Sequence, residues 1–386
     1  MKLKLKLPLL LCVLLLTVSL CTGSQLFLLL SALILLVVIG NIAAVIWAAS
    51  TLESGGNLSG ATVRRGDDLL LSLHVRHRGL LPVAPILLEL NDPAGNDGRE
   101  IRLKNIPGKR QSMQFPIHAS HVGVFSVGLQ ACTVEDLFSM VSRRIPLNRS
   151  SFELVVWPNT FTVEPLTLAP GDPGSELMSR ATEDLNAPSD NRTYQPGDAM
   201  KKIHWKLSLR KGELMVRKFD EPILQDVLIL MDCSRPPSWG HPQAEADLRD
   251  ALLETAASVF SAQSSTDHQI RMPLLGSHPV DIEKSMGLSI VMDYLARVDF
   301  SETDRFERVL AIESRRLRKV GCVVVIAARL NIPMVDIMIR MHRAGPNIRL
   351  YHVTFAPDDE NVLPLIARLK HSGIEVSYVI PELSGQ

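Results

Sequence analysis

Residues 226–236 read DVLILMDCSRP, a run of five apolar residues framed by aspartates. An unbroken apolar run of this length is typical of a parallel strand that is buried on both faces. A second unbroken run lies at 322–327, and further strands are expected at 269–275, 350–355 and 374–380, with helical periodicities between them. Strands and helices that alternate, joined by right-handed crossovers, predict a doubly wound α/β domain over residues 223–386.

The loop after the first of these strands is a candidate site, because ligands in such folds bind beyond the carboxyl ends of the strands. It resembles the Asp-x-Ser-x-Ser opening of the von Willebrand factor A domain, which holds a divalent ion. Asp232 and Ser234 match that opening, but Pro236 replaces the second serine and has no side-chain oxygen to offer. The resemblance implies a von Willebrand factor A-like domain with a degenerate metal site. We expect no cofactor, with Mg²⁺ as the less favoured alternative.

The stretch before this domain predicts a linker followed by a basic helix. Residues 166–190 are rich in Pro, Gly, Ser and Asp, and the whole segment 166–222 separates the two halves of the chain. Asp198 is the expected N-cap of a helix that runs to about Leu209, and Gly212 is its expected stop.

Lys202, Lys206 and Arg210 fall on one face of that helix. Like charges at this spacing oppose helix formation by ~0.2–0.5 kcal/mol a pair, so the stripe calls for an acidic partner. If the partner is internal, the stripe is an ordinary salt-bridged or solvated face. If it is external, the stripe is a docking surface for phosphate or an acidic protein. One aromatic ring, Trp205, and a balance of 41 basic against 41 acidic residues do not indicate nucleic acid.

The segment from Arg192 to Arg217 follows the pattern Arg-x-Tyr-x-x-Gly-Asp-x-x-Lys-x-Ile-His-Trp-Lys-x-Ser-x-Arg-x-Gly-Glu-Leu-x-Val-Arg. This pattern resembles the signature of a bacterial family called domain of unknown function fifty-eight. Residues 155–158 resemble the strand that precedes its linker. The chain departs from the family at Glu135–Ser139, where Asp-Leu-Phe-Ser stands in place of Asp-Pro-Phe-Gly.

The family resemblance also implies an anchor and a partner. A leading pair of transmembrane helices is usual in the family, and its members are typically encoded beside MoxR-type AAA+ ATPases, which act as chaperones. Such an ATPase is therefore the expected partner, with the signature as the contact surface. The candidate partner-binding residues are Arg192, Tyr194, Asp198, Lys202, Trp205, Lys206 and Arg210.

Residues 55–165 change to a period of two. Apolar residues at 69, 71, 73 and 75 alternate with their neighbours, and further short runs are separated by Gly, Pro and Asn. Several short strands at such spacing predict a β-sandwich-like domain.

The first fifty residues predict a membrane anchor. Leu7–Cys21 and Leu26–Ala49 are apolar and separated by four residues, which predicts an antiparallel helical hairpin. The second run has 24 residues without a charge, enough to span a core of ~30 Å. A cleaved signal peptide followed by a single anchor is the alternative.

Charge and small residues refine the anchor. Three lysines precede the hairpin and Arg64 and Arg65 follow it, so both of its ends are expected in the cytoplasm. The net charge of the whole chain is zero only because of these lysines, since the remainder has 38 basic against 41 acidic residues. Gly40, Ala44 and Ala48 share one helix face, which predicts close packing on the first helix or in a homo-oligomer.

No catalytic motif is present: the sequence has no GxxxxGK[ST], HExxH, GxSxG or GxGxxG. Five scattered cysteines form neither a disulfide framework nor a metal knuckle and suit a reducing compartment. We therefore expect a non-catalytic, multi-pass adaptor of the bacterial inner (plasma) membrane, with cytoplasmic soluble domains. A cell-envelope enzyme of unknown reaction and a metal-dependent adhesion module are the alternatives.

Overall fold

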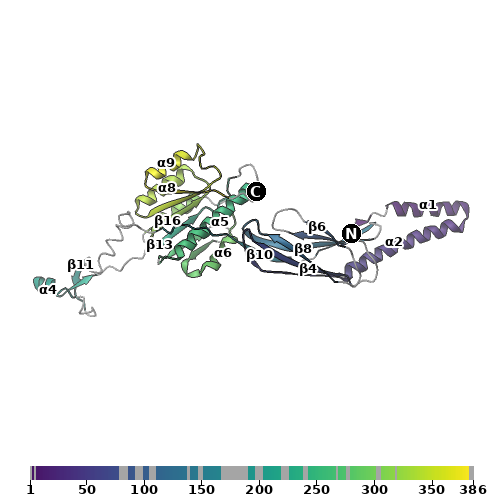
Figure 1. Cartoon of the computed structure of the whole chain (residues 1–386), viewed down its shortest axis with the longest axis horizontal. Coiled ribbons are helices and arrows are strands. Elements are labelled where there is room, and N and C mark those ends of the chain that lie inside the picture. Colours follow the sequence, from purple (N-terminus) through teal and green to yellow (C-terminus); the bar gives the residue numbers. More distant parts are fainter. Residues whose placement is uncertain are drawn as a thin grey trace. The chain divides into compact units, whose positions relative to one another are not determined.

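The computed structural model describes residues 2–3, 6–77, 86–91, 99–103, 110–136, 140–146, 151–166, 190–195, 203–218, 226–237, 242–266, 268–274, 279–300, 306–317 and 320–381. These residues form a mixed α/β protein with several sheets, divided into two compact units, Met1–Trp157 and Pro158–Gln386 (Figure 1).

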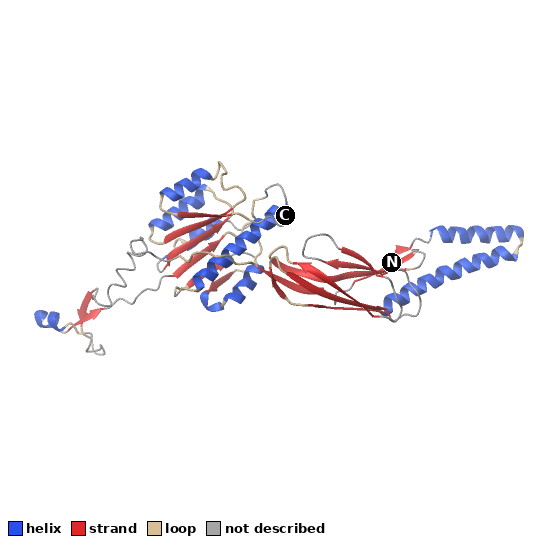
Figure 2. Ribbon diagram, in the orientation of Figure 1, coloured by secondary structure: helices blue, strands red, loops and turns tan. Residues whose placement is uncertain are grey.

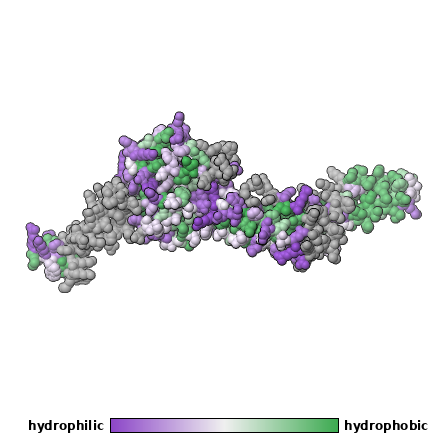
Figure 3. Space-filling view, in the orientation of Figure 1, coloured by the Kyte–Doolittle hydropathy of each residue, from purple (hydrophilic) through white to green (hydrophobic). Residues whose placement is uncertain are grey.

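The first unit begins with two antiparallel apolar helices, α1 (Lys6–Thr22) and α2 (Gln25–Thr51), which pack against each other (Figure 2). Gly23 makes the turn between them with φ +66°, and its N–H donates to the Ser19 carbonyl at 2.9 Å. Helix α2 is long and apolar enough to cross a membrane, whereas α1, with 17 residues, is shorter. Figure 3 shows the apolar surface of both helices.

The small-residue stripe does not form the contact between these helices. The buried residues of α2 are Ser31, Val38, Val45 and Ala48, and Ala48 belongs to the core of the β-rich part of this unit. Gly40 is exposed, and a Cβ added there would meet no atom within 4 Å. The expectation that Gly40 allows close approach of α1 is therefore wrong, because the helices meet along Ser31 and its neighbours instead.

The rest of this unit consists of two sheets that share one hydrophobic core. The smaller sheet pairs β2 (Leu52–Leu58), β4 (Asp68–His77) and β7 (Arg110–His118) in antiparallel fashion. The larger has seven strands: β1 (Lys2–Leu3), β3 (Thr62–Arg64), β5 (Ile86–Asn91), β6 (Arg99–Leu103), β8 (Gly123–Glu135), β9 (Val141–Pro146) and β10 (Ser151–Trp157). The alternating residues of β4 enter the core as its pattern predicted, since Leu71 and Leu73 are buried while Leu70 is half exposed.

The start of the chain pairs with this β-rich part. Strand β1 lies antiparallel to β9, with Leu3 opposite Val141. At its other end the hairpin runs directly from α2 into β2. Both ends of the α1–α2 hairpin therefore meet the same β-rich body.

The second unit is built on a six-stranded sheet in the order β15-β14-β13-β16-β17-β18. Its strands are β13 (Asp226–Met231), β14 (Ile270–Leu274), β15 (Val280–Glu283), β16 (Val320–Ala327), β17 (Asn347–Val353) and β18 (Glu375–Val379). Neighbouring strands are parallel except for β14 and β15. The antiparallel edge strand β15 was not predicted, because its four residues, Val-Asp-Ile-Glu, are too few to show a period.

Helices accompany the strands of this sheet. They are α5 (Pro242–Ser264), α6 (Leu288–Ala296), α7 (Phe306–Glu313), α8 (Ile332–Arg343) and α9 (Leu363–His371), with a 3-10 turn at Lys284–Met286. One core joins Leu228, Leu230 and Val323 to α7, α8 and α9. Residues of the opposite parity, such as Ile229 and Val324, are also buried, and α5 packs against β13, β16 and β17. The mixed α/β class of this half is confirmed.

The family signature forms a small module of its own. Strands β11 (Asp190–Thr193) and β12 (Met215–Lys218) pair in antiparallel fashion, and the short helix α4 (Trp205–Lys211) precedes β12.

Candidate functional site

The signature module is held together by one buried serine. Ser208 of α4 accepts a hydrogen bond from the Met215 amide at 2.8 Å through its Oγ, which also donates to the His204 carbonyl at 3.1 Å. Ile203, Met215 and Val216 form the small apolar interior around it. The serine therefore ties the helix to β12, and the opposite face of α4 is left outward.

Helix α4 begins later than the sequence pattern predicted. Ile203, expected inside a helix, instead bridges Val216 as an extended residue, and the helix starts at Trp205. His204 is the N-cap, and its Nδ1 accepts from the Leu207 amide at 3.2 Å. The physical reason is that a β-branched side chain next to β12 gains more by pairing and burial than by extending the helix.

The other end of the helix agrees with the prediction. Gly212 adopts the left-handed conformation, with φ +74°, and its N–H donates to the Ser208 carbonyl at 2.8 Å. This is the C-cap geometry that glycine favours.

The later start changes the predicted basic stripe. Lys206 and Arg210, two of the three residues of the predicted stripe, lie one turn apart on α4 and are exposed. Asp198 and Lys202 lie outside the described residues, as does the side chain of Arg192. Tyr194 is half-buried, and its amide donates to the Leu214 carbonyl at 2.7 Å.

The exposed face of α4 also carries two apolar residues, of which Trp205 was a predicted candidate and Leu209 was not. Trp205 is 59% exposed and Leu209 is 85% exposed. Because they are four residues apart, they lie on the same face. The Trp205–Leu209 pair beside Lys206 and Arg210 forms the α4 surface. Leu209 could have been predicted from the sequence, because it lies four residues after Trp205 within the basic signature segment.

A second group of polar residues lies at the carboxyl edge of the sheet. Asp232 follows β13, is 3% exposed, and its amide donates to the Ile326 carbonyl of β16 at 2.8 Å. Its Oδ1 accepts from the Ser234 amide at 3.0 Å and from Ser234 Oγ at 2.5 Å. Strands β13 and β16 are where the strand order reverses direction, the usual place for a ligand in an open α/β sheet.

Electrostatics at Asp232 are mixed. Burial raises the pKa of its carboxyl group, while the hydrogen bonds from Ser234 and the charge of Arg329 act in the opposite direction. The nearby Glu307 carboxylate, at the start of α7, raises the pKa further. Asn331 belongs to the same corner, since it caps α8 and its side-chain amide donates to Glu307.

These residues fit a divalent ion poorly. The Oδ1 of Asp232 already accepts two hydrogen bonds from Ser234, and Pro236 supplies no side-chain ligand. Arg329 brings a positive charge to the place where an ion would need negative ones. Among the described residues, Asp232 does not belong to a group of three or more His, Cys, Asp or Glu side chains whose ligand atoms are close enough together to hold an ion. Arg329 and Glu307 were not predicted, because only the folded chain brings them to Asp232.

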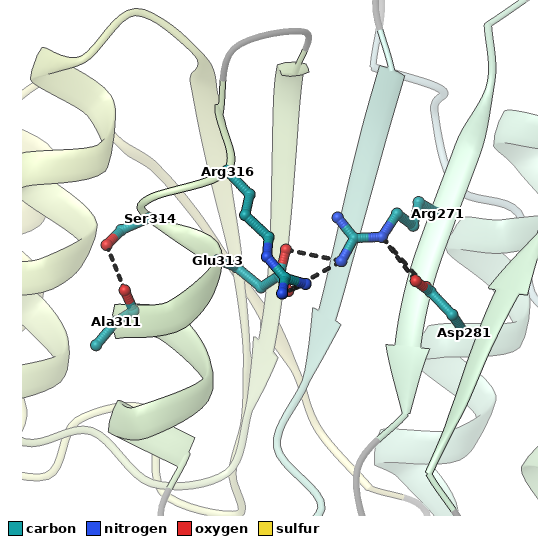
Figure 4. A network of polar contacts seen from close by, with 6 residues as sticks. All are labelled: Arg271, Asp281, Ala311, Glu313, Ser314 and Arg316. Atoms are coloured by element: carbon teal, nitrogen blue, oxygen red, sulfur yellow. Dashed lines mark hydrogen bonds and ion pairs between the residues drawn. The ribbon is translucent and has the colours of Figure 1, made fainter.

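A third feature is an ion-pair network between the edge of the sheet and α7 (Figure 4). The Nη2 of Arg271 donates to both oxygens of Glu313 at 2.9 Å, and its Nε donates to Asp281 at 2.9 Å. Burial alone would lower the pKa of Arg271, but the hydrogen bonds to the two carboxylates raise it overall. Arg316 reaches the same glutamate at 3.5 Å.

This network borders a cavity of about 310 Å³ whose wall includes Leu274, Val309 and Ile312. Two arginines face two carboxylates there, and Glu313 stands at the negative end of a helix. The charges are therefore balanced within the network, and its arrangement stabilises the joint between α7 and the β14–β15 hairpin.

Taken together, these features define a protein with an apolar N-terminal helix suited to a membrane, a β-rich unit and a mixed α/β unit that carries a separate basic module. Residues 190–370 match the family model described as "Protein of unknown function DUF58". Over these residues, the family resemblance that the signature predicted is confirmed. The match begins at the first residue of β11 and ends within α9, so it includes the module and most of the sheet.

Other comparisons add little. No curated protein matches the chain. The CARDB domain of the PF1109 protein from Pyrococcus furiosus, solved in complex with di-metal ions, is 15% identical with a TM-score of 0.20 and covers 28% of this chain and 94% of its own. Spo0M, a sporulation control protein from Bacillus subtilis, is 11% identical with a TM-score of 0.16 and covers 38% of this chain and 58% of its own. Cwp6 from Clostridium difficile is 9% identical with a TM-score of 0.21 and covers 86% of this chain and 53% of its own. TM-scores this low carry no argument about fold or function.

Proposed function

We propose that this protein is a non-catalytic, membrane-anchored adaptor that works with a MoxR-type AAA+ ATPase in the assembly or maturation of a protein complex. The ATPase is the partner that the family resemblance implies. The proposal places the contact on the α4 surface and the anchor in the N-terminal helices.

The observation that carries the proposal is that the basic residues of α4 are exposed and have no ion-pair partner among the described residues. Lys206, Arg210 and Lys211 are exposed, and none of them has an ion pair with another residue of the described ranges. Glu213, two residues beyond the helix, has no ion pair with them among the described residues, and Asp232 is buried with Ser234. Exposed cations that have no ion-pair partner among the described residues favour an external acidic partner over a salt-bridged face.

The anchor is proposed as a hairpin in which both α1 and α2 cross the membrane. Pairing of β1 with β9 supports this, because it holds the start of α1 at the same β-rich body that receives the end of α2. A signal peptide cleaved near Cys21 would remove β1 and its pairing. The protein is then anchored in the bacterial inner membrane with its soluble parts in the cytoplasm. The lysines before the hairpin agree with this orientation.

The second unit is proposed to be a doubly wound, von Willebrand factor A-like domain. Its strand order and the helices on both sides of the sheet support this identity. In this chain the domain recognises proteins without the divalent ion, because the corner of Asp232 and Arg329 fits an ion poorly.

Purification from detergent extracts tests the adaptor role. The wild-type protein is expected to retain an AAA+ ATPase, and the double variant Lys206→Glu, Arg210→Glu is expected to lose it. The matched control is Arg308→Glu, Arg315→Glu, which reverses two exposed charges in and beside α7. Failure of the wild type to retain any ATPase, or equal retention by both double variants, contradicts the proposal.

An enzyme remains the second candidate because of one observation. A buried aspartate with a raised pKa at the carboxyl edge of a sheet is a common feature of catalytic sites. Turnover by the purified protein that is lost in Asp232→Asn, but kept in Lys206→Glu, Arg210→Glu, would favour the enzyme over the adaptor.

A further inference from the structure

The apolar part of the α4 surface calls for an explanation that the charges alone do not supply. Leu209 is 85% exposed and Trp205 is 59% exposed, although both lie on a helix whose other side has its own buried interior. Leu214, just beyond the helix, is a further 45% exposed. Ser208, Ile203 and Val216 hold the module together, so these outward side chains are not needed for its fold.

Their surroundings restrict what can cover them. Lys206 and Arg210 flank the apolar pair on the neighbouring face, and Lys211 follows at the end of the helix. Figure 3 shows polar and apolar residues next to each other on this module. A surface complementary to this one would need an apolar cleft for the indole and leucine side chains and carboxylates around its rim.

The size of the surface favours a protein over a membrane as the occupant. Helix α4 has seven residues and spans only about 10 Å at 1.5 Å a residue, so it offers a bilayer just two apolar side chains. A tryptophan and an arginine within one compact patch are the composition of a hot spot in a protein interface.

We infer that Trp205 and Leu209 are hydrophobic anchors that insert into an apolar, acid-rimmed cleft of a partner protein, with Lys206 and Arg210 pairing to the rim. The inference rests on the proposed adaptor role, but it concerns the chemistry of the contact and not the identity of the partner.

Photo-crosslinking of the full chain in its own membrane tests the inference. A benzophenone amino acid at position 209 is expected to crosslink to an acid-rich segment of a protein, and the crosslink is expected to disappear on Lys206→Glu, Arg210→Glu. The same probe at position 332 is the matched control, since Ile332 is 60% exposed on α8. Crosslinks only to lipid, crosslinks to a segment without acidic residues, or a yield no higher than at position 332 would each overturn the inference.

A second measurement separates the anchors from the charges. Trp205→Ala and Leu209→Ser are each expected to weaken binding of the crosslinked protein at least about tenfold, as hot-spot residues do. Ile332→Ser is expected to leave binding unchanged, and hydrogen exchange of the Met215 amide reports whether the module stays folded.

The two proposals fail in different ways. If an AAA+ ATPase is retained and lost on charge reversal, but Trp205→Ala and Leu209→Ser bind it normally, the anchors are refuted and the adaptor stands. If position 209 crosslinks to an acidic protein that is not an ATPase, the anchors stand and the proposed partner is refuted.

Discussion

Asp232 shows how one buried group links structure to pH. Because burial raises the pKa of this carboxyl above the ordinary value of 3.8, the folded chain holds the proton more tightly than the unfolded chain does. The free energy of unfolding therefore falls as the pH rises from 3.8 through the raised pKa, and it stays at the lower value above that pH.

Asp232→Asn removes this loss, since an amide oxygen still accepts from the Ser234 amide but carries no charge. The variant is expected to be more stable than the wild type at neutral pH, with a difference that shrinks toward pH 3.8. Denaturant unfolding of both proteins across this range measures it. If the wild type is the more stable protein at neutral pH, the prediction is wrong. Interactions of the ionised Asp232 carboxylate then outweigh the cost of its burial.

Ser208 is the residue on which the signature module depends. In Ser208→Ala the buried amide of Met215 loses its acceptor, and an unsatisfied buried donor costs about 1–3 kcal/mol. Hydrogen exchange at residue 215 is expected to speed up accordingly, about tenfold for each 1.4 kcal/mol.

Leu209→Ser is the comparison for this change, because its side chain is exposed and its loss should leave exchange at residue 215 nearly unchanged. If both variants speed up exchange equally, the serine has no special role in holding the module.

At the scale of elements, the ion-pair network fixes α7 to the β14–β15 hairpin. Glu313 is 6% exposed and binds Arg271 through both oxygens, so Glu313→Gln leaves a partly buried guanidinium with one carboxylate fewer. We expect a loss of about 2 kcal/mol, below the ~3–5 kcal/mol of a fully buried pair, because Arg271 is 27% exposed and keeps Asp281.

Urea unfolding of the purified protein measures this loss. Asp281→Asn is the control, since its side chain is 52% exposed and should cost no more than about 1 kcal/mol. Equal effects of the two substitutions would mean that the burial of Glu313 contributes nothing.

The elements also show what the sequence could predict. Strands β13 and β16 were predictable because an unbroken apolar run is typical of a strand in a parallel sheet that is covered on both faces. The start of α4 was not predictable, because Ile203 is extended only through its pairing with Val216, thirteen residues later in the chain. Local propensity describes one segment at a time, whereas pairing depends on the partner strand.

The candidate site was predictable to a similar degree. Asp232 and Ser234 were identified from their place after a strand, and Lys206, Arg210 and Trp205 from the signature. Arg329 and Glu307 could not be, because they come from segments about 100 and 75 residues away along the chain and meet Asp232 only in the folded sheet. Residues that meet only through tertiary packing have no regular spacing in the sequence by which they could be recognised.

At the scale of the whole molecule, the two units carry different parts of the proposed role. The first unit combines the membrane-suited helix α2 with a β-rich body that holds both ends of the hairpin. The second unit combines the sheet and the α4 surface within the matched family region. An ATP-driven partner is available only in the cytoplasm, so the adaptor role requires the second unit to be there.

The side of the membrane on which the second unit lies is therefore the most direct test. A reporter fused after Gln386 that is active only in the cytoplasm, paired with one that is active only outside the inner membrane, measures it in living cells. Activity of the cytoplasmic reporter alone is the predicted result. Activity of the outer reporter alone would separate the α4 surface from every cytoplasmic ATPase and contradict the adaptor.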